Sequence, residues 1–144
     1  MRTTAEGPRS ILASEILRLV PCDRIAFAVP LPNGSGFRIA GVHPEAPPFP
    51  DFPIPLHGSC TAHVAATRHG ELLSGIGEET RYAEEEPLYR AGIHDAAFVP
   101  LILGGELVAV AIVGRTEVHS LEARSVRCLE KVSEIGRASC RERV

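Results

Sequence analysis

The segment with the greatest capacity for chemistry is residues 54–70, IPLHGSCTAHVAATRHG, which carries three histidines, one serine and one cysteine. His57 and Ser59 flank a glycine just before a predicted helix. The free backbone N–H groups and the dipole at a helix N-terminus suit an anion or a carbonyl oxygen. His57 and Ser59 are therefore candidate ligand contacts. A plainer interpretation is that Ser59 only caps the helix, as serine often does.

Cys60 follows at the same helix N-terminus, a setting that can lower the pKa of a thiol. An enzymatic role would require an exposed Cys60 with a second reactive group in reach. The chain has four cysteines, Cys22, Cys60, Cys128 and Cys140, with no CxxC pairing, so we interpret them as reduced, buried thiols. We keep Cys60 as a candidate ligand contact and predict no catalytic residue.

His63 is a further candidate contact on the same predicted helix. Paired metal ligands on a helix are four residues apart, whereas His63 and His69 are six apart. We therefore predict no metal site.

Polar and aromatic residues nearer the middle of the chain complete the candidate set. His94 and Asp95 precede a strongly apolar stretch and could contact a ligand, although a turn aspartate beside a solvated histidine is a simpler account. Tyr82, Tyr89 and Phe98 could stack on a planar ligand, and core packing is the alternative for each.

Composition excludes several classes of protein. The chain has 144 residues, with 15 basic against 18 acidic side chains, and the basic residues are scattered singly. This distribution is unlike that of a protein that binds nucleic acid or an anionic membrane. Because no signal sequence and no apolar run of about 20 residues is present, we expect a cytoplasmic protein.

The two ends of the chain are set apart from the domain. The last nine residues, GRASCRERV, break the preceding amphipathic pattern and match a string that recurs at the ends of unrelated sequences as adapter read-through. We therefore predict a disordered segment at residues 1–9, one domain at residues 10–135 and a read-through tail at residues 136–144.

Apolar periodicity predicts the elements that position these residues. A helix is expected at residues 10–20, capped by Ser10 and stopped by Pro21, and strands at 24–29 and 37–42. A proline-rich loop at 43–55 leads to a short strand at 54–56. A helix capped by Ser59 and ended by Gly70, a strand at 72–73 and a helix at 84–91 follow. Ser120 is expected to cap a closing helix with Leu121, Val126, Leu129, Val132 and Ile135 near one face.

A β-hairpin is the strongest single feature of the pattern. Two apolar runs within residues 93–114 are separated only by Gly104 and Gly105, which supply the positive φ angles of a two-residue primed turn. Pro100 cannot donate to a strand ladder and should lie at an edge or a bulge. Since both faces of the hairpin are apolar, helices must cover it. The element order predicts an α+β fold with an antiparallel sheet of about five to six strands.

Three stretches of the chain resemble a GAF domain. They are IPLHGSCTAHVAATRHGELLSG, AGIHDAAFVPLILGGELVAVAIVGRTE and LEARSVRCLEKVSEI, and together the resemblance covers residues 10–135. Within the hairpin the family pattern is matched by Val99, Pro100, Leu101, Gly104, Gly105 and Val108. Ser74-Gly75 stand where members often carry an aspartate, and His119-Ser120 replace the usual Phe-Ser.

The resemblance implies a small-molecule sensory or regulatory module of bacterial signalling proteins. In such a module the terminal helices lie on one face of the sheet, and short helices and loops enclose a pocket over the other. Members usually pair through their terminal helices and precede an output such as a histidine kinase, a diguanylate cyclase or a transcription activator. The resemblance therefore implies a homodimer, a fused output domain and no enzymatic activity, with helix repositioning coupled to pocket occupancy.

One branch of the family, the free methionine-(R)-sulfoxide reductases, is enzymatic and uses cysteines here and in the segment before the hairpin. That second segment, AGIHDAAF, contains no cysteine in this chain, which leaves thiol catalysis as a weaker alternative. The Cys-His pair of tetrapyrrole-binding relatives is also absent, haem held by a lone histidine stays open, and the cofactor remains unknown.

A ligand-free GAF fold acting as a dimerisation spacer is the principal alternative function. The two functions differ in their interior. A closed interior filled by valine and leucine favours the spacer, and an open cavity with polar groups such as Ser59, His63 or His94 favours the sensor.

Overall fold

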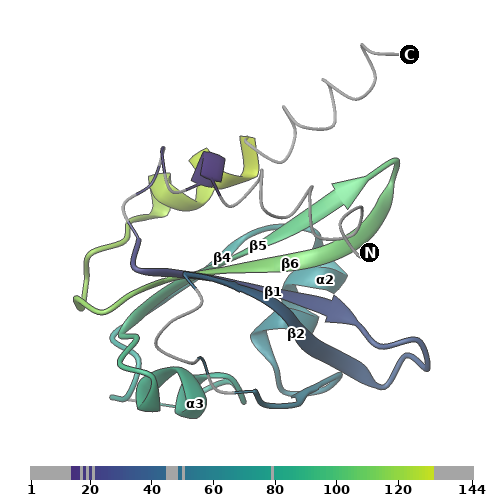
Figure 1. The fold of residues 1–144 in the computed structure, drawn as a ribbon, viewed down its shortest axis with the longest axis horizontal. Coiled ribbons are helices and arrows are strands. Elements are labelled where there is room, and N and C mark those ends of the chain that lie inside the picture. The colour runs from purple at the N-terminus through teal and green to yellow at the C-terminus, as the bar shows by residue number, and fades with distance from the viewer. Residues whose placement is uncertain are drawn as a thin grey trace.

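A six-stranded antiparallel sheet organises the molecule (Figure 1). The computed structural model describes residues 14–16, 18, 20, 22–44, 49, 51–78 and 80–131. The strand order is β3-β2-β1-β6-β5-β4, and every pair is antiparallel. The predicted fold class is thereby confirmed. The strands are β1 Arg24–Pro30, β2 Gly36–His43, β3 Ile54–Pro55, β4 Glu71–Ser74, β5 Asp95–Leu103 and β6 Glu106–Arg115.

The hairpin of β5 and β6 has the predicted turn. Leu103 pairs with Glu106, so only Gly104 and Gly105 connect the strands. Their φ angles are 58° and 85°, values that glycine adopts without a steric cost and that match the twist of the flanking strands.

Pro100 also lies where its missing N–H predicts. It follows Phe98, the last residue of β5 that pairs with β4, and it precedes a shift in the β5–β6 register between Leu101 and Ile102. Pro100 therefore lies beyond the part of β5 that pairs with β4 and next to the bulge in the β5–β6 ladder.

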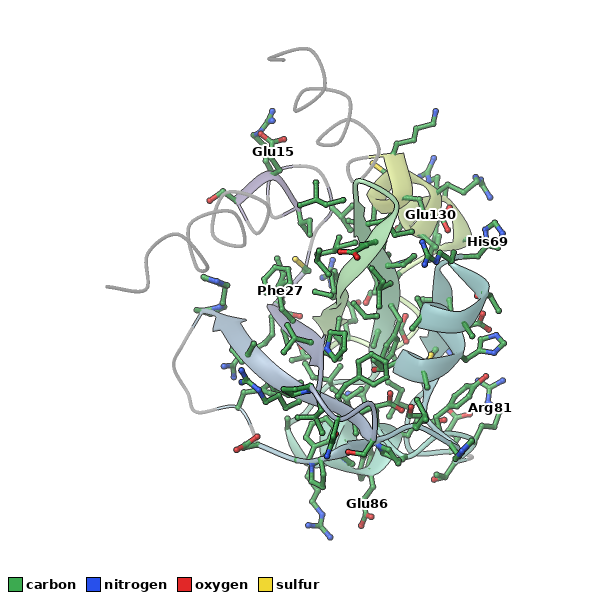
Figure 2. All side chains as sticks on the ribbon, turned by 90° about the vertical axis from the view of Figure 1, so that its right-hand side faces the viewer. Glu15, Phe27, His69, Arg81, Glu86 and Glu130 are labelled. Atoms are coloured by element: carbon green, nitrogen blue, oxygen red, sulfur yellow. The ribbon has the colours of Figure 1, made fainter. Side chains whose placement is uncertain are left out.

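Alternation along the strands divides the interior into two cores. In β1, Ile25 and Phe27 point to one face of the sheet and Ala26 and Ala28 to the other. Phe27 lies inside the molecule in Figure 2, whereas Arg81 and Glu86 project from its periphery. Residues near both ends of the chain, in and beside helices, cover the first face through Ile16, Val20, Leu121, Val126 and Leu129.

The second face is covered by two short helices, α2 Cys60–Thr67 and α3 Glu85–Arg90. Their buried side chains Val64 and Leu88 share a core with Phe98 and Ile112 of the hairpin. This arrangement confirms the prediction that terminal helices lie on one face and short helices on the other.

The end of α2 differs from the prediction. Arg68, not Gly70, ends the helix: it adopts a left-handed φ of 64°, and its N–H donates to the Val64 carbonyl. The Arg68 guanidinium bonds the carbonyl of Gly105 at the hairpin turn, which holds the residue there. Gly70 instead donates its N–H to the Glu130 carboxylate, 2.6 Å away.

The start of the closing helix also differs. The helix covers residues 123–131, so Ser120 lies too far ahead of it to be the cap, and its hydroxyl donates to the carbonyl of Glu117. Ser125 accepts from the Glu122 N–H instead, and its own N–H donates to the Glu122 carbonyl. Ser10, Pro21, Val132 and Ile135 and the segments 1–9 and 136–144 lie outside the described residues.

Asp95 joins the hairpin to the segment that leads into the closing helix. Its side chain is fully buried, and Oδ1 accepts from the Ser74 hydroxyl and from the N–H groups of Gly75 and His119 at 2.9–3.2 Å. Oδ2 accepts from the Leu121 N–H at 3.0 Å. Burial raises the pKa of this carboxyl, but the four hydrogen bonds outweigh burial, so the pKa lies below its ordinary value.

We expect Asp95→Asn to lower the free energy of unfolding by about 1–3 kcal/mol at neutral pH, because the new NH₂ group must face one of the N–H donors. Urea denaturation measures this loss, and Asp51→Asn, at an exposed position, is the control. Because folding depresses the pKa of Asp95, its stabilisation is present above the unfolded value of 3.8 and is lost as the pH falls through the folded value. The difference between wild type and variant should therefore shrink below about pH 4. A difference that stays constant with pH would contradict this role.

Candidate functional site

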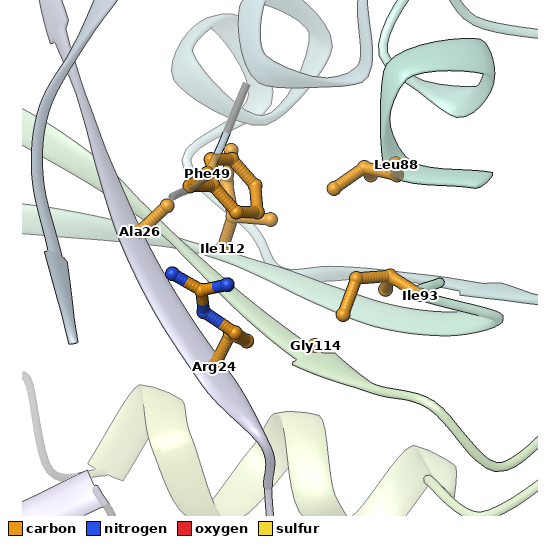
Figure 3. A pocket seen from close by; sticks show the side chains of 7 residues that line it. All are labelled: Arg24, Ala26, Phe49, Leu88, Ile93, Ile112 and Gly114. Carbon is orange, nitrogen blue, oxygen red and sulfur yellow. The ribbon is translucent and has the colours of Figure 1, made fainter. Parts of the chain in front are cut away.

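A narrow pocket lies on the face of the sheet that α2 and α3 cover (Figure 3). It encloses about 170 Å³, counting its opening to solvent, and is too narrow to admit a water molecule. Its lining comes from β1, β6, α3 and the segments before β3 and β5: Arg24, Ala26, Phe49, Leu88, Ile93, Ile112 and Gly114. Apart from Arg24, this lining is apolar.

The position of Arg24 follows from the alternation of β1. Arg24 shares its face with Ala26 and Ala28, and it pairs across the ladder with Gly114 of β6. These neighbours are small, so the long arginine side chain can lie along the sheet, inside the core. Figure 3 shows its guanidinium pointing into the pocket toward Phe49.

Among the described residues, the Arg24 guanidinium has no carboxylate partner. The side chain is 9% exposed. Nη2 donates to the Pro44 carbonyl at 2.9 Å, and the guanidinium carbon lies 5.3 Å from the centre of the Phe49 ring. Nε is buried without a hydrogen-bond partner, and no carboxylate of the described residues forms an ion pair with Arg24. The sequence analysis missed this residue, although a charge on the face shared with Ala26 and Ala28 was the available signal.

The N-terminus of α2, predicted as an anion site, is filled by the chain itself. The buried carboxylate of Glu84 accepts from the N–H groups of Cys60 and Thr61 at 2.8 and 2.7 Å. Ser59 accepts from the Ala62 N–H at 3.1 Å and donates to the Pro55 carbonyl at 2.6 Å. Glu84 therefore occupies the place expected for a ligand, and Ser59 acts as a cap.

Cys60 has the opposite electrostatics from those expected at a helix N-terminus. Its side chain is fully buried, and burial first, then the charge of Glu84, raise the pKa of the thiol well above its ordinary value. Because the reactive species of cysteine is the thiolate, this environment makes Cys60 unreactive. The helix N-terminus therefore does not lower the pKa of this thiol, because burial, and after it the charge of Glu84, raises it.

Three of the other candidates lie near α2. His57 is exposed in the preceding loop. The exposed His63 places its ring 6.3 Å from that of Tyr82, and its Nε2 lies 3.8 Å from a Glu71 oxygen. Burial is the main cause that raises the pKa of Tyr82. Only His63 and Tyr82 of these three contact each other, and none of the three lines the described pocket.

The remaining candidates lie near α3 and the base of the hairpin. The half-exposed Tyr89 meets the edge of the His94 ring, with centroids 5.6 Å apart, and His94 Nδ1 donates to the Thr116 carbonyl at 2.7 Å. The Asp95 carboxylate already accepts four hydrogen bonds from within the protein. Phe98 is fully buried in the core beneath α2 and α3. None of the nine predicted site residues lines the described pocket.

We expect Glu84→Gln to destabilise the domain by about 1–3 kcal/mol, because both carboxylate oxygens are used and the amide would set its NH₂ group against one α2 N–H. Chemical denaturation followed by circular dichroism measures the loss. The matched control is Glu86→Gln, whose exposed pair with Arg90 contributes little. Equal stability of the two variants would show that Glu84 does not hold α2 in place.

The described residues contain neither a metal-binding cluster nor a membrane-spanning helix. Within the described residues, no group of three or more His, Cys, Asp and Glu side chains is placed to hold a metal ion. Over that same part of the chain, no helix has both the length and the apolar character needed to cross a membrane.

The fold is similar to that of several solved structures. The GAF domain of a two-component sensor histidine kinase from Bacillus halodurans has a TM-score of 0.75 at 17% identity, covering 93% of this chain and 91% of that one. A GAF domain/HD domain protein from Geobacter sulfurreducens has a TM-score of 0.70 at 12% identity, covering 90% and 86%. The type II free methionine-R-sulfoxide reductase from Thermoplasma acidophilum has a TM-score of 0.67 at 11% identity, covering 95% and 94%. At these identities the likeness establishes the fold alone.

The sequence itself establishes the family. No curated protein matches the chain. The sequence profile of the GAF domain, however, matches residues 10–134, which span both terminal helices, the sheet and the pocket. The chain therefore belongs to the GAF domain family.

Proposed function

We propose that this GAF domain is a sensory module that binds a small molecule in the pocket beside α3 and signals through its terminal helices. The carrying observation is that the pocket and the terminal helices share the same strands. Arg24 and Ala26 of β1 line the pocket. The alternate residues Ile25 and Phe27 of the same strand pack on the other face of the sheet, against the terminal helices.

This arrangement gives a physical route for signalling. Ile112 and Gly114 of β6 line the pocket, and Val113 between them faces the opposite core. Both interiors are tightly packed, so a ligand that shifts these strands must also shift the contacts of Val126 and Leu129 in the closing helix. A ligand acts in this way only if it has different affinities for the two arrangements.

The output is proposed to lie in a domain outside this chain, such as a histidine kinase, a diguanylate cyclase or a transcription activator. The similarity to a sensor histidine kinase domain supports this class of partner. Pairing of two copies through the terminal helices would carry the signal between subunits.

A ligand-free dimerisation spacer is the second candidate. Its support is the narrowness of the described pocket, which is apolar apart from Arg24 and does not admit water. A spacer needs only a well-packed interior and a stable dimer contact.

We propose no enzymatic activity for the domain. Thiol chemistry would need an accessible thiolate, and Cys60 is fully buried with a raised pKa. Within the described residues no second cysteine shares the core of Cys60, since Cys22 and Cys128 pack on the opposite face of the sheet.

For a sensor, we expect one class of compound to raise the melting temperature when cyclic nucleotides, haem, amino acids and carboxylic acids are added singly, because a ligand of the folded state stabilises it by mass action. The same compound should change the hydrogen exchange of backbone amides in residues 123–131, across the sheet from the pocket. Because the chain contains no tryptophan, circular dichroism is the suitable readout of melting. No response to any class, together with a dimer that persists on dilution in sedimentation experiments, would replace the sensor with the spacer.

A further inference from the structure

We propose that the pocket binds the carboxylate group of a small, otherwise apolar acid, and that Arg24 is the residue that anchors it. This inference rests on the proposed sensory function and specifies the chemical class of the ligand. It starts from the one buried cation of the pocket.

The Arg24 guanidinium has a nitrogen whose hydrogen bond is not satisfied. Water is the usual partner of an exposed arginine, but Arg24 is 9% exposed and its Nε has no hydrogen-bond partner. The Pro44 carbonyl and the Phe49 ring are both neutral, so they solvate the charge without balancing it. Within the described part of the chain no carboxylate balances this charge, and an anion at the unpartnered Nε would reduce the cost of burying it.

The planar shape of the Arg24 guanidinium also favours a carboxylate ligand. A guanidinium presents its N–H groups in a planar fork that matches a carboxylate, and such charge-assisted hydrogen bonds are stronger than neutral ones. In Figure 3 the guanidinium lies on the pocket side of the sheet and faces Phe49. A ligand carboxylate seated there would take the free Nε and compete with the Pro44 carbonyl for Nη2.

The apolar lining limits the rest of the ligand. Leu88, Ile93 and Ile112 offer no hydrogen bonds from their side chains, so the body of the ligand should be aliphatic or aromatic. A phosphate group carries more charge and more acceptor oxygens than one guanidinium can satisfy. A monocarboxylate matches the single cation.

The small volume limits size and predicts how the ligand enters. The pocket has no room for even one water molecule, so it lies far below the roughly 300–1,000 Å³ of pockets for drug-sized ligands. Because the pocket does not admit water as it stands, a lining side chain must move when a ligand binds. Phe49 is the candidate, since it lies over the guanidinium, is half-buried and belongs to neither a helix nor a strand.

The test compares acids with their neutral amides on the whole chain. Butyrate, isovalerate, benzoate and phenylacetate are each paired with the corresponding amide, and inorganic phosphate is the control for a non-specific anion effect. We expect at least one acid to raise the melting temperature by roughly 5–10 °C at 100 times its dissociation constant, with no shift for its amide or for phosphate.

Two variants assign the effect to Arg24. Arg24→Met keeps the length of the side chain without its charge. It should melt at or above the wild-type temperature without ligand, because an unbalanced buried charge is removed, and it should lose the shift caused by the acid. Arg24→Lys keeps the charge but not the fork and should weaken binding by tenfold or more. Arg38→Met, at an exposed position of the neighbouring strand β2, should leave the shift intact.

Three results would overturn the inference: no shift with any of the four acids, equal shifts with acids and amides, or an unchanged shift in Arg24→Met. If Arg24→Met does not fold, the comparison of acid with amide on the wild type and the Arg24→Lys affinity decide the matter. If cyclic nucleotides, haem or amino acids stabilise the domain while the acids do not, the sensory function stands and the carboxylate assignment is wrong. If nothing stabilises it, both fail.

Discussion

The constraint on which this structure depends is that both faces of the central strands are buried. The first five residues of β1 and the first seven of β5 are buried without interruption, because terminal helices cover one face and α2 and α3 the other. A polar side chain in such a sheet has no access to water, so it must find a partner inside the protein. The hydrogen-bond partners of each buried charged side chain therefore show whether its charge is satisfied inside the protein.

Three buried charged groups illustrate this constraint in different ways. Asp95 and Glu84 are both fully buried, and each is satisfied by backbone N–H groups, which stabilise a carboxylate without a counterion. Asp95 ties the hairpin to the closing segment, and Glu84 ties α3 to the start of α2. Of these three groups, only Arg24 has a buried side-chain polar atom without a hydrogen-bond partner, and Arg24 lines the pocket.

Local features were predictable because neighbouring residues determine them. Gly104-Gly105 determine a primed turn through their φ angles, the alternation of Ile25 and Phe27 with Ala26 and Ala28 assigns the faces of β1, and Ser59 caps α2. Errors arose where a distant contact overrode local preference. Arg68 ends α2 ahead of Gly70, and its side chain bonds the hairpin turn. Ser120 is not the cap, because the closing helix begins at residue 123, after Leu121, whose N–H donates to Asp95.

The sequence by itself determined the fold class and the division of the strands into two faces, since these follow from the period of apolar residues and from glycines at turns, and the order of its motifs carried the resemblance to the family. Only the tertiary structure decided which residues form the candidate site. Glu84 reaches the N–H of Cys60 across 24 residues of chain, and Arg24 meets the Pro44 carbonyl across 20. No local pattern predicts such pairs, because the sequence around a carboxylate or guanidinium does not show which distant donor or acceptor will bond it after folding. The predicted anion site at α2 and the observed cationic pocket at β1 differ for that reason.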